Sequence, residues 1–314
     1  MRIVANLPLY PPGSRVGAWI STHECLAALV KSGHDVHVIT YLHTPPFPYD
    51  LDGVQVHPKA TLDDLAAGAD VIVSHLGDDQ QASAYAHEAG IPSVRMVHGT
   101  PAANHRLVDG EMAVFNSASL AGEVRWPGRQ VVVHPPIHQA DYQTTPGDLV
   151  TLVNLSASKG AHVLWALARR MPDTQFLAVR GSYGTQVVRS RPNVEVIDPT
   201  PDMAADVYAR TRTLLMPSKA ETWGRTGIEA ACSGIPTIAH PTPGLLESLA
   251  DAGTFIDRSN IAAWAAAIRR LQDPDQWAAA SHLARARAVE LDPAPDLARF
   301  VEAVEHLAGD RVAA

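Results

Sequence analysis

The chain has 314 residues, a length that predicts two domains of ordinary size. Its composition, 46% hydrophobic and 18% charged, is typical of a globular protein, and its net charge of −8 argues against a general nucleic-acid-binding protein. No apolar run approaches the ~20 residues that a membrane-spanning helix needs. We interpret Cys25 and Cys232 as buried free thiols, which favours a reducing, cytoplasmic location.

The first elements form a βαβ unit. Residues 2–7 are mainly apolar and are soon followed by prolines, so we expect a first buried strand here and no signal peptide. A loop with Gly13 and Gly17 follows, then a helix over about 18–32 and a strand over 35–40. In doubly wound domains of this kind, ligands bind beyond the carboxyl ends of the strands. The loop lacks the G-x-G-x-x-G spacing of a dinucleotide-binding fingerprint.

The alternation of strands and helices continues to a candidate linker over residues 140–148, which lack periodicity and contain Thr-Thr-Pro-Gly. Before it we expect strands over 54–56, 70–75, 93–98, 113–117 and 130–134, and a helix over 80–89. We therefore predict a first domain over 1–142, a second over 143–292, and a C-terminal helix over 293–314 that packs back on the first domain.

The pattern restarts after the linker. We expect strands over 149–154, 175–179, 194–197, 213–216, 237–239 and 254–256, helices near 161–170, 203–209 and 228–232, and helical residues over 260–307, broken by Pro293 and Pro295. Two halves of repeating β and α elements predict an α/β protein with two doubly wound, Rossmann-like domains facing a central cleft.

One strand–loop–helix stretch, from Pro217 to Ala230, carries two carboxylates. Glu221 stands on the loop and Glu229 stands inside the helix. A helix N-terminus attracts anions through its free N–H groups and the positive end of its dipole. Carboxylates that flank such an anion suit hydroxyl groups better than phosphate oxygens. Our first hypothesis is a phosphate at the helix start with sugar hydroxyls on both sides.

The spacing of these glutamates, with Gly234-Ile235-Pro236 and Pro243-Gly244-Leu245-Leu246-Glu247 after them, resembles the retaining glycosyltransferases of family 4, which have the GT-B fold. The resemblance covers most of the chain to about residue 260. Other segments resemble the family's phosphate-binding segment, opening loop, central histidine loop and interdomain approach; they are residues 154–160, 10–17, 97–100 and 134–137.

The resemblance implies roles for individual residues. Glu229 would accept hydrogen bonds from the ribose of a nucleotide-sugar donor, and Glu221 would contact the donor sugar or order the diphosphate site. Lys159 would neutralise the diphosphate. Gly17 would let the N-terminal loop approach the phosphates, and His98 would lie beside the transferred sugar, near its C6 group.

The resemblance also implies contacts from the backbone and from two further loops. Backbone N–H groups would line the donor sugar at Trp223, Gly224 and Arg225, and the phosphate at Thr226 and Gly227. The base would lie against the loops that contain Arg180-Gly181 and Ile197-Asp198-Pro199.

Asn154 departs from the family pattern, because the family usually has an arginine at this position, five residues before the lysine. Its loss removes one cation from the diphosphate site. Arg180 and Arg225 are the candidates to replace it.

The implied activity is hexosyl transfer with retention, from a nucleotide-diphosphate sugar to a hydroxyl acceptor. The departing diphosphate acts as base in a same-face displacement, with no obligatory metal and no further cofactor. We expect a UDP- or GDP-sugar as donor. Two alternatives remain open: a nucleotide-sugar epimerase on the same fold, and an inactive GT-B-like binding or partner subunit.

The acceptor remains open among a small molecule, a glycan and a modified nucleic-acid base. Residues 1–146 contain eight basic and 14 acidic residues, a net charge of −6, which is a poor match to a polyanion. A local basic patch of Arg15, Arg95 and Arg106 is the feature that would favour nucleic acid. The sequence predicts neither the base and sugar of the donor nor the oligomeric state.

Overall fold

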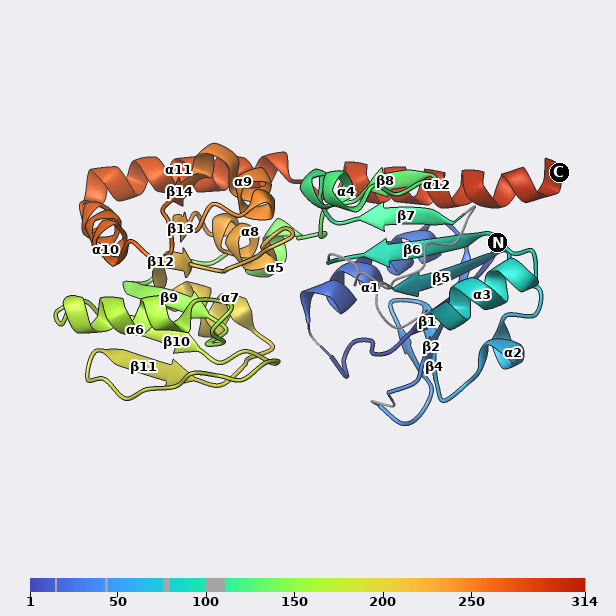
Figure 1. The fold of residues 1–314 in the computed structure, drawn as a ribbon, viewed down its shortest axis with the longest axis horizontal. Coiled ribbons are helices and arrows are strands. Elements are labelled where there is room, and N and C mark those ends of the chain that lie inside the picture. The colour runs from blue at the N-terminus through green and yellow to red at the C-terminus, as the bar shows by residue number, and fades with distance from the viewer. Residues whose placement is uncertain (15, 43–44, 76–79, 100–110, 314) are drawn as a thin grey trace. The chain divides into compact units, whose positions relative to one another are not determined.

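The structure, a computed structural model, describes residues 1–14, 16–42, 45–75, 80–99 and 111–313 and consists of two compact units (Figure 1). The first unit comprises Met1–Pro136 and Pro293–Ala314, and the second comprises Ile137–Asp292. The chain thus enters the second unit after Pro136, where we predicted a boundary after Tyr142. Within the described part of the chain, no helix is both long and apolar enough to cross a bilayer.

The first unit contains an eight-stranded sheet of order β3-β4-β2-β1-β5-β6-β7-β8. The strands are β1 (Arg2–Leu7), β2 (Asp35–Thr40), β3 (Tyr49–Leu51), β4 (Val54–Pro58), β5 (Val71–His75), β6 (Ser93–Val97), β7 (Met112–Phe115) and β8 (Gln130–Val132). Neighbouring strands run parallel except β3 and β4, which are antiparallel. The central strands are buried on both faces, which explains their continuous apolar runs.

Helices cover both faces of this sheet. They are α1 (Gly17–Lys31), α2 (Leu62–Leu65), α3 (Gln80–Glu88), α4 (Ala118–Val124) and α12 (Ala294–Ala313). One core joins Leu26 of α1 to Phe300 and Val304 of α12. The backbone N–H of His134 also donates to the Asp296 carboxylate at 2.8 Å. The C-terminal helix therefore belongs to the first unit although it follows the second in sequence.

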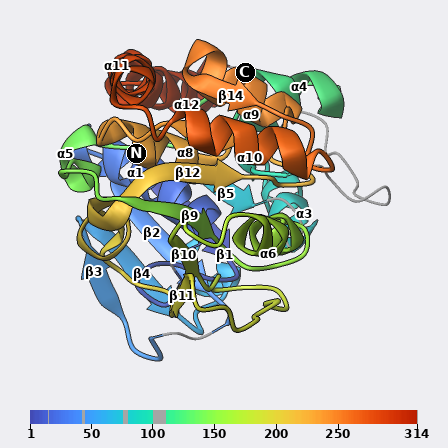
Figure 2. The same cartoon turned by 90° about the vertical axis from the view of Figure 1, so that its left-hand side faces the viewer.

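The second unit contains a six-stranded, fully parallel sheet of order β11-β10-β9-β12-β13-β14, which is labelled in full in Figure 1; Figure 2 shows β9 to β12 from the side of the second unit. The strands are β9 (Leu149–Val153), β10 (Phe176–Val179), β11 (Val194–Ile197), β12 (Thr211–Met216), β13 (Thr237–Ala239) and β14 (Gly253–Phe255). The helices are α5 (Gln139–Tyr142), α6 (Ala161–Arg170), α7 (Met203–Asp206), α8 (Arg225–Cys232), α9 (Pro243–Leu249), α10 (Ile261–Arg270) and α11 (Pro274–Glu290).

Two cores form on the two faces of this sheet. The first includes Trp165 of α6 and Trp264 of α10, and the second includes Ile228 of α8 and Leu245 of α9. Both cores extend to alternate residues of the central strands, as a doubly wound domain requires. Cys25 and Cys232 are buried free thiols, one in each unit.

Residues 140–148, predicted to be a linker, are attached to the second unit. The Ser233 hydroxyl, which follows the last residue of α8, donates to the Tyr142 carbonyl at 2.7 Å. It accepts from the Thr144 N–H at 2.8 Å. The lack of periodicity therefore reflects a segment fixed by single hydrogen bonds and not a free connection.

Candidate functional site

The predicted donor-site residues of the second unit gather at the carboxyl edge of its sheet. The loop of residues 154–160 follows β9 and contains Lys159. The loop of residues 217–224 follows the neighbouring strand β12 and contains Glu221. Because parallel strands that are neighbours end at the same edge, the two loops are brought together.

Lys159 and Glu221 form an ion pair in which Nζ lies 2.5 Å from Oε1. The Ser218 hydroxyl donates to the same carboxylate oxygen at 2.8 Å. Burial alone would lower the pKa of Lys159, but the charges and hydrogen bonds of Glu221 and Tyr183 together outweigh burial and raise the pKa above its usual value. The ammonium is therefore protonated at neutral pH.

Two glycines allow these loops to pack backbone against backbone. Gly160 has φ of +89°, and a Cβ atom there would lie 2.6 Å from the Pro217 carbonyl oxygen. Gly244, in the first turn of α9, would place a Cβ atom 2.4 Å from the Glu221 carbonyl oxygen. Any larger side chain at either position would move the loops that hold the ion pair.

Glu229 lies in a second polar cluster, with 6% of its surface exposed. Arg225 Nε donates to Oε1 at 2.6 Å, and the Tyr208 hydroxyl donates to Oε2 at 2.7 Å. Arg225 Nη2 also donates to the Tyr142 hydroxyl at 3.0 Å. Each carboxylate oxygen has a second acceptor site, so Glu229 can still accept hydrogen bonds from a ligand.

The pKa values of this cluster follow from burial and from the Glu229 charge. Burial would lower the pKa of Arg225, but Glu229 and Tyr142 together outweigh burial and raise the pKa. Burial raises the pKa of the Tyr208 hydroxyl well above its usual value, and Glu229 adds to the effect. Both groups therefore stay protonated as donors around the carboxylate.

The start of α8 is held by neighbouring backbone and side-chain groups. Gly224 caps the helix with φ of +89°. Trp223 is 2% exposed, and its carbonyl accepts from the Ser248 hydroxyl at 2.6 Å. The Gly227 N–H, predicted to line a phosphate, donates to the Gly224 carbonyl at 2.9 Å. Thr226 is the second residue of the helix.

The remaining predicted donor residues lie at the ends of β9, β10 and β11. Arg180 Nη1 pairs with the Asp198 carboxylate at 2.8 Å, and both side chains are exposed. Asn154 is buried and has φ of +70°. Its side-chain oxygen accepts from the Ser156 N–H at 3.0 Å and from Gln186 Nε2 at 3.2 Å. The side chain that stands in place of the family's usual arginine is thus hydrogen-bonded to its own loop and to Gln186.

The carboxyl edge of the first unit's sheet carries the other two predicted residues, Gly17 and His98. His98 follows β6, and its Nδ1 lies 3.1 Å from Nε2 of His75, the last residue of β5. Trp19, near the start of α1, contacts the His75 ring with the centroids 4.4 Å apart. Burial, and then the neighbouring His75, lower the pKa of His98 well below its usual value, so its imidazole is neutral at pH 7.

The basic patch proposed from Arg15, Arg95 and Arg106 is wrong with respect to Arg95. This side chain is 1% exposed, and its Nη2 atom lies 2.8 Å from the buried Glu111 carboxylate. Arg15 and Arg106 lie outside the described residues, as does Thr100 of the predicted histidine loop.

Several contributors to these clusters carry no motif in the sequence. Tyr142 fell in the predicted linker, and Tyr208, Gln186 and His75 lie far from their partners along the chain. Ser218 is the residue of this kind that the sequence could have indicated, because it lies inside the Pro217–Ala230 stretch, three residues before Glu221.

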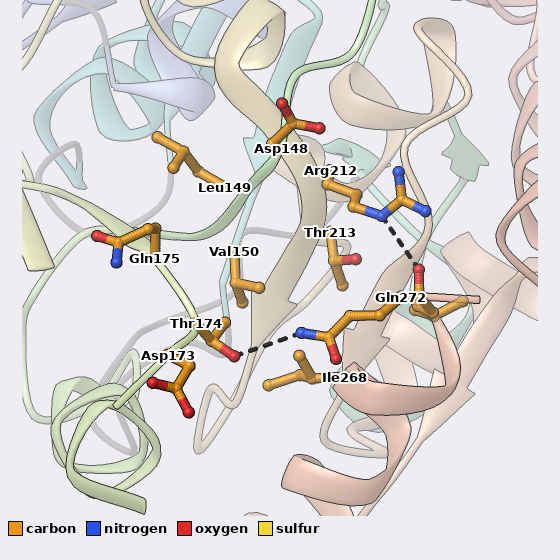
Figure 3. A pocket seen from close by; sticks show the side chains of 11 residues that line it. Asp148, Leu149, Val150, Asp173, Thr174, Gln175, Arg212, Thr213, Ile268 and Gln272 are labelled. Carbon is orange, nitrogen blue, oxygen red and sulfur yellow. Dashed lines mark hydrogen bonds between the residues drawn. The ribbon is translucent and has the colours of Figure 1, made fainter. Parts of the chain in front are cut away.

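A cavity of about 220 Å³ opens at the opposite, amino edge of the second unit's sheet (Figure 3). Gln272 Nε2 donates to Thr174 Oγ1 at 3.3 Å, and Arg212 Nε donates to the Leu271 carbonyl at 3.1 Å. Doubly wound sheets bind ligands at the carboxyl edge, so we do not assign a substrate to this cavity. Among the described residues, no group of three or more His, Cys, Asp and Glu side chains is arranged to hold a metal ion.

Comparisons with known proteins give a family match for one part of the chain. Residues 148–273 match the family model described as glycosyl transferases group 1. This range contains the Lys159–Glu221 pair, Arg225 and Glu229. No curated protein sequence matches the chain.

Solved structures with a similar fold cover nearly the whole chain. Sucrose-phosphate synthase from Thermosynechococcus elongatus is 16% identical with a TM-score of 0.71, covering 99% of this chain and 97% of that one. A glycosyltransferase from Rickettsia africae is 14% identical with a TM-score of 0.76, covering 97% and 98%. Anabaena HepE in complex with UDP-glucose is 17% identical with a TM-score of 0.74, covering 97% and 99%.

These likenesses confirm the predicted fold class. Two Rossmann-like units with parallel sheets, in a chain that matches glycosyltransferase structures along its length, are the GT-B architecture. The chain therefore has the GT-B fold, and residues 148–273 of its second unit match the group 1 glycosyl transferase family model.

Proposed function

We propose that the chain is a retaining glycosyltransferase that moves a hexosyl group from a nucleotide-diphosphate sugar to a hydroxyl acceptor. The observation that carries the proposal is the pair of polar clusters around Glu221 and Glu229 at the carboxyl edge of the second unit. Lys159, Glu221, Arg225 and Glu229 lie within residues 148–273, the matched range. The complexes of HepE with UDP and UDP-glucose support a UDP-sugar as the first donor to test, with a GDP-sugar second.

Lys159 is the proposed cation for the departing diphosphate. It is protonated at neutral pH and mostly buried, so its charge acts in a medium that screens little. In the absence of donor this charge is balanced by Glu221. An arriving diphosphate would share or take the ammonium, which leaves the Glu221 carboxylate to accept hydrogen bonds from the donor sugar.

Glu229 is the proposed partner of the donor ribose. Arg225 and Tyr208 each occupy one acceptor site on its carboxylate and fix its orientation. The two remaining acceptor sites match two adjacent hydroxyl groups. A carboxylate fixed in this way before binding loses little conformational entropy when the ribose arrives.

The proposed reaction takes place on one face of the sugar. The bond from the anomeric carbon to the diphosphate oxygen breaks, and the acceptor oxygen forms a bond to the same carbon. The acceptor proton passes to the leaving diphosphate oxygen, so no side chain acts as base. The pairing of both glutamates with cations fits hydroxyl binding better than proton transfer. We propose that no metal or further cofactor is required, because Lys159 and the start of α8 supply positive charge.

The other predicted contacts follow the same proposal. His98 would contact the transferred sugar as a neutral imidazole, and Gly17 would allow close approach to the phosphates. Arg180 and Asp198, on loops after β10 and β11, would lie near the base. The acceptor is a hydroxyl compound whose class, small molecule, glycan or modified base, has to be found by experiment.

The test begins with thermal-shift measurements against UDP, GDP, ADP, dTDP and their sugars. We expect the nucleotide and nucleotide sugar of one base to raise the melting temperature selectively, and we expect the Glu229→Ala variant to lose this shift. The selected donor is then incubated with acceptor panels, and the anomeric configuration of the product is read by NMR. Conversion of the donor sugar without an acceptor would identify an epimerase. The absence of any shift would contradict nucleotide binding.

A further inference from the structure

Gln186 lies in the loop between β10 and β11, and its side chain joins two loops of the proposed donor site. We propose that Gln186 is a positioning residue for nucleotide binding, which fixes the loop after β9 against the loop after β10. The inference rests on the proposed function, since it gives Gln186 a part in binding the donor.

The side-chain oxygen of Gln186 connects the ends of two neighbouring strands. It accepts from the Leu155 N–H and from the Gly181 N–H, both at 2.8 Å. Leu155 follows β9, and Gly181 follows β10, its parallel neighbour. One atom therefore satisfies backbone donors from both loops, and its removal leaves both without this acceptor.

The side-chain nitrogen makes a second set of contacts. Nε2 donates to Asn154 Oδ1 at 3.2 Å, to the Tyr183 carbonyl at 2.9 Å and to the Gly184 carbonyl at 3.0 Å. An amide has two N–H groups, so one of them is shared between acceptors. Exchanging the nitrogen and oxygen would place N–H groups against two backbone N–H donors, so these partners fix the amide orientation.

The two loops also contact each other directly. A Cβ atom at Gly181 would lie 2.3 Å from Cγ of Asn154, so the Asn154 side chain rests on the Gly181 backbone. Ser156 and Gln186 form an antiparallel bridge, and the Val187 N–H donates to the Leu155 carbonyl at 2.7 Å. Residues 154–156 and 181–187 thus form one continuous structure.

This structure leads to the two groups that would meet the donor. The Lys159 N–H lies 3.4 Å from the Ser156 hydroxyl, within the loop that begins at Asn154. Arg180 directly precedes Gly181 and pairs with Asp198. A change at Gln186 would therefore displace the proposed diphosphate cation and the proposed base-binding loop together. Asn154 stands in place of the family's usual arginine. It helps to join the two loops and supplies no charge.

The test compares Gln186→Ala and Gln186→Glu with the wild type. The glutamate variant keeps the shape and the acceptor, but it cannot donate and would set a carboxylate against three oxygen atoms. We expect both variants to bind UDP about tenfold more weakly or worse in calorimetry, since both loops lose their relative position. The melting temperature without ligand should fall by only a few degrees.

The matched control is Gln272→Ala. Gln272 makes one side-chain hydrogen bond, to Thr174, at the amino edge of the same sheet (Figure 3). Its removal should leave the dissociation constant for UDP unchanged. A purely structural glutamine at position 186 would give the same result as this control, with a lower melting temperature and unaltered binding.

The outcomes separate the inference from the proposed function. If the nucleotide panel selects a nucleotide other than UDP, that nucleotide replaces UDP in these measurements. Equal affinity for the selected nucleotide in the wild type and in Gln186→Ala would overturn the inference and leave the proposed function intact. If the wild type binds none of UDP, GDP, ADP and dTDP, the proposed function fails and the inference fails with it. If Gln186→Ala does not fold, Gln186→Glu decides. Loss of folding in both variants would assign Gln186 to fold stability and overturn its role in binding.

Discussion

Replacing Gly244 by alanine tests whether close backbone packing holds Glu221 in place. The added Cβ atom would lie 2.3 Å from the Thr222 carbonyl carbon and 2.4 Å from the Glu221 carbonyl oxygen. Carbon atoms in contact are optimally about 3.5–4.0 Å apart, so the backbone at 221–222 must move by about 1 Å or more. Both nearest atoms belong to the backbone, so no side-chain rotation can relieve the overlap.

The expected effects follow from this displacement. Overpacking costs about 1–3 kcal/mol of unfolding free energy. For a unit of this size, each kcal/mol lowers the melting temperature by about 2–4 °C. Glu221 would also move away from Lys159, which it contacts at 2.5 Å. A displacement of about 1 Å in a catalytic site can reduce turnover about a hundredfold.

The assay is calorimetric melting together with turnover of the donor that the nucleotide panel selects. Gly122→Ala is the matched control, because Gly122 lies in α4 and a Cβ atom there meets nothing within 4 Å. The control should be as stable as the wild type or more stable, by up to about 1 kcal/mol. Wild-type melting and turnover in Gly244→Ala would refute the packing argument.

Three further predictions address the two polar clusters and His98. Tyr208→Phe removes a hydrogen bond to the buried Glu229 carboxylate. Thermal denaturation should therefore show an unfolding free energy lower by about 1.5–3 kcal/mol, and calorimetry should show weaker binding of the nucleotide. Wild-type values in both measurements would exclude a supporting role for the hydroxyl. Lys159→Ala should lower kcat more than donor affinity in steady-state kinetics, and a change in affinity alone would make Lys159 a binding residue. The pKa of His98 is lower in the folded than in the unfolded state, so its contribution to stability is present above about pH 6.5 and is lost as the pH falls. The melting temperature should therefore fall less steeply between pH 7.5 and pH 5 for His98→Asn than for the wild type. Parallel pH profiles of the two melting temperatures would contradict the argument.

The sequence predicted the repeating strands and helices of both units, because a parallel sheet covered on both faces needs uninterrupted apolar runs. Val71–His75 and Phe176–Val179 are examples, each within a residue of the expected range. Short elements with little apolar content were missed. Helix α2, Leu62–Leu65, begins at a capping box between Thr61 and Asp64, which fixes one turn without any periodic pattern.

The sequence indicated those candidate-site residues that stand in a recognisable motif. Glu221 and Glu229 share one loop and helix, and Lys159 follows a strand with a glycine beside it. Tyr208 and Gln186 were not predicted, because their hydrogen-bond partners depend on which strands are neighbours. The topology of the whole sheet determines these neighbours. The prediction for Arg95 was wrong for the same reason, since the burial of an arginine depends on a carboxylate from another part of the sheet, here Glu111, which directly precedes β7.

The two-part composition of the first unit has a consequence for how the chain folds during synthesis. Helix α12 supplies Phe300, Val304 and three further buried residues to a core whose remaining residues belong to the first part of the chain. Residues 137–292, which make the complete second unit, leave the ribosome before this helix does. The second unit can therefore finish folding first, reversing the usual order of N-terminal before C-terminal domain. Until α12 arrives, the nascent first unit exposes the apolar groups that this helix covers, including those on α1.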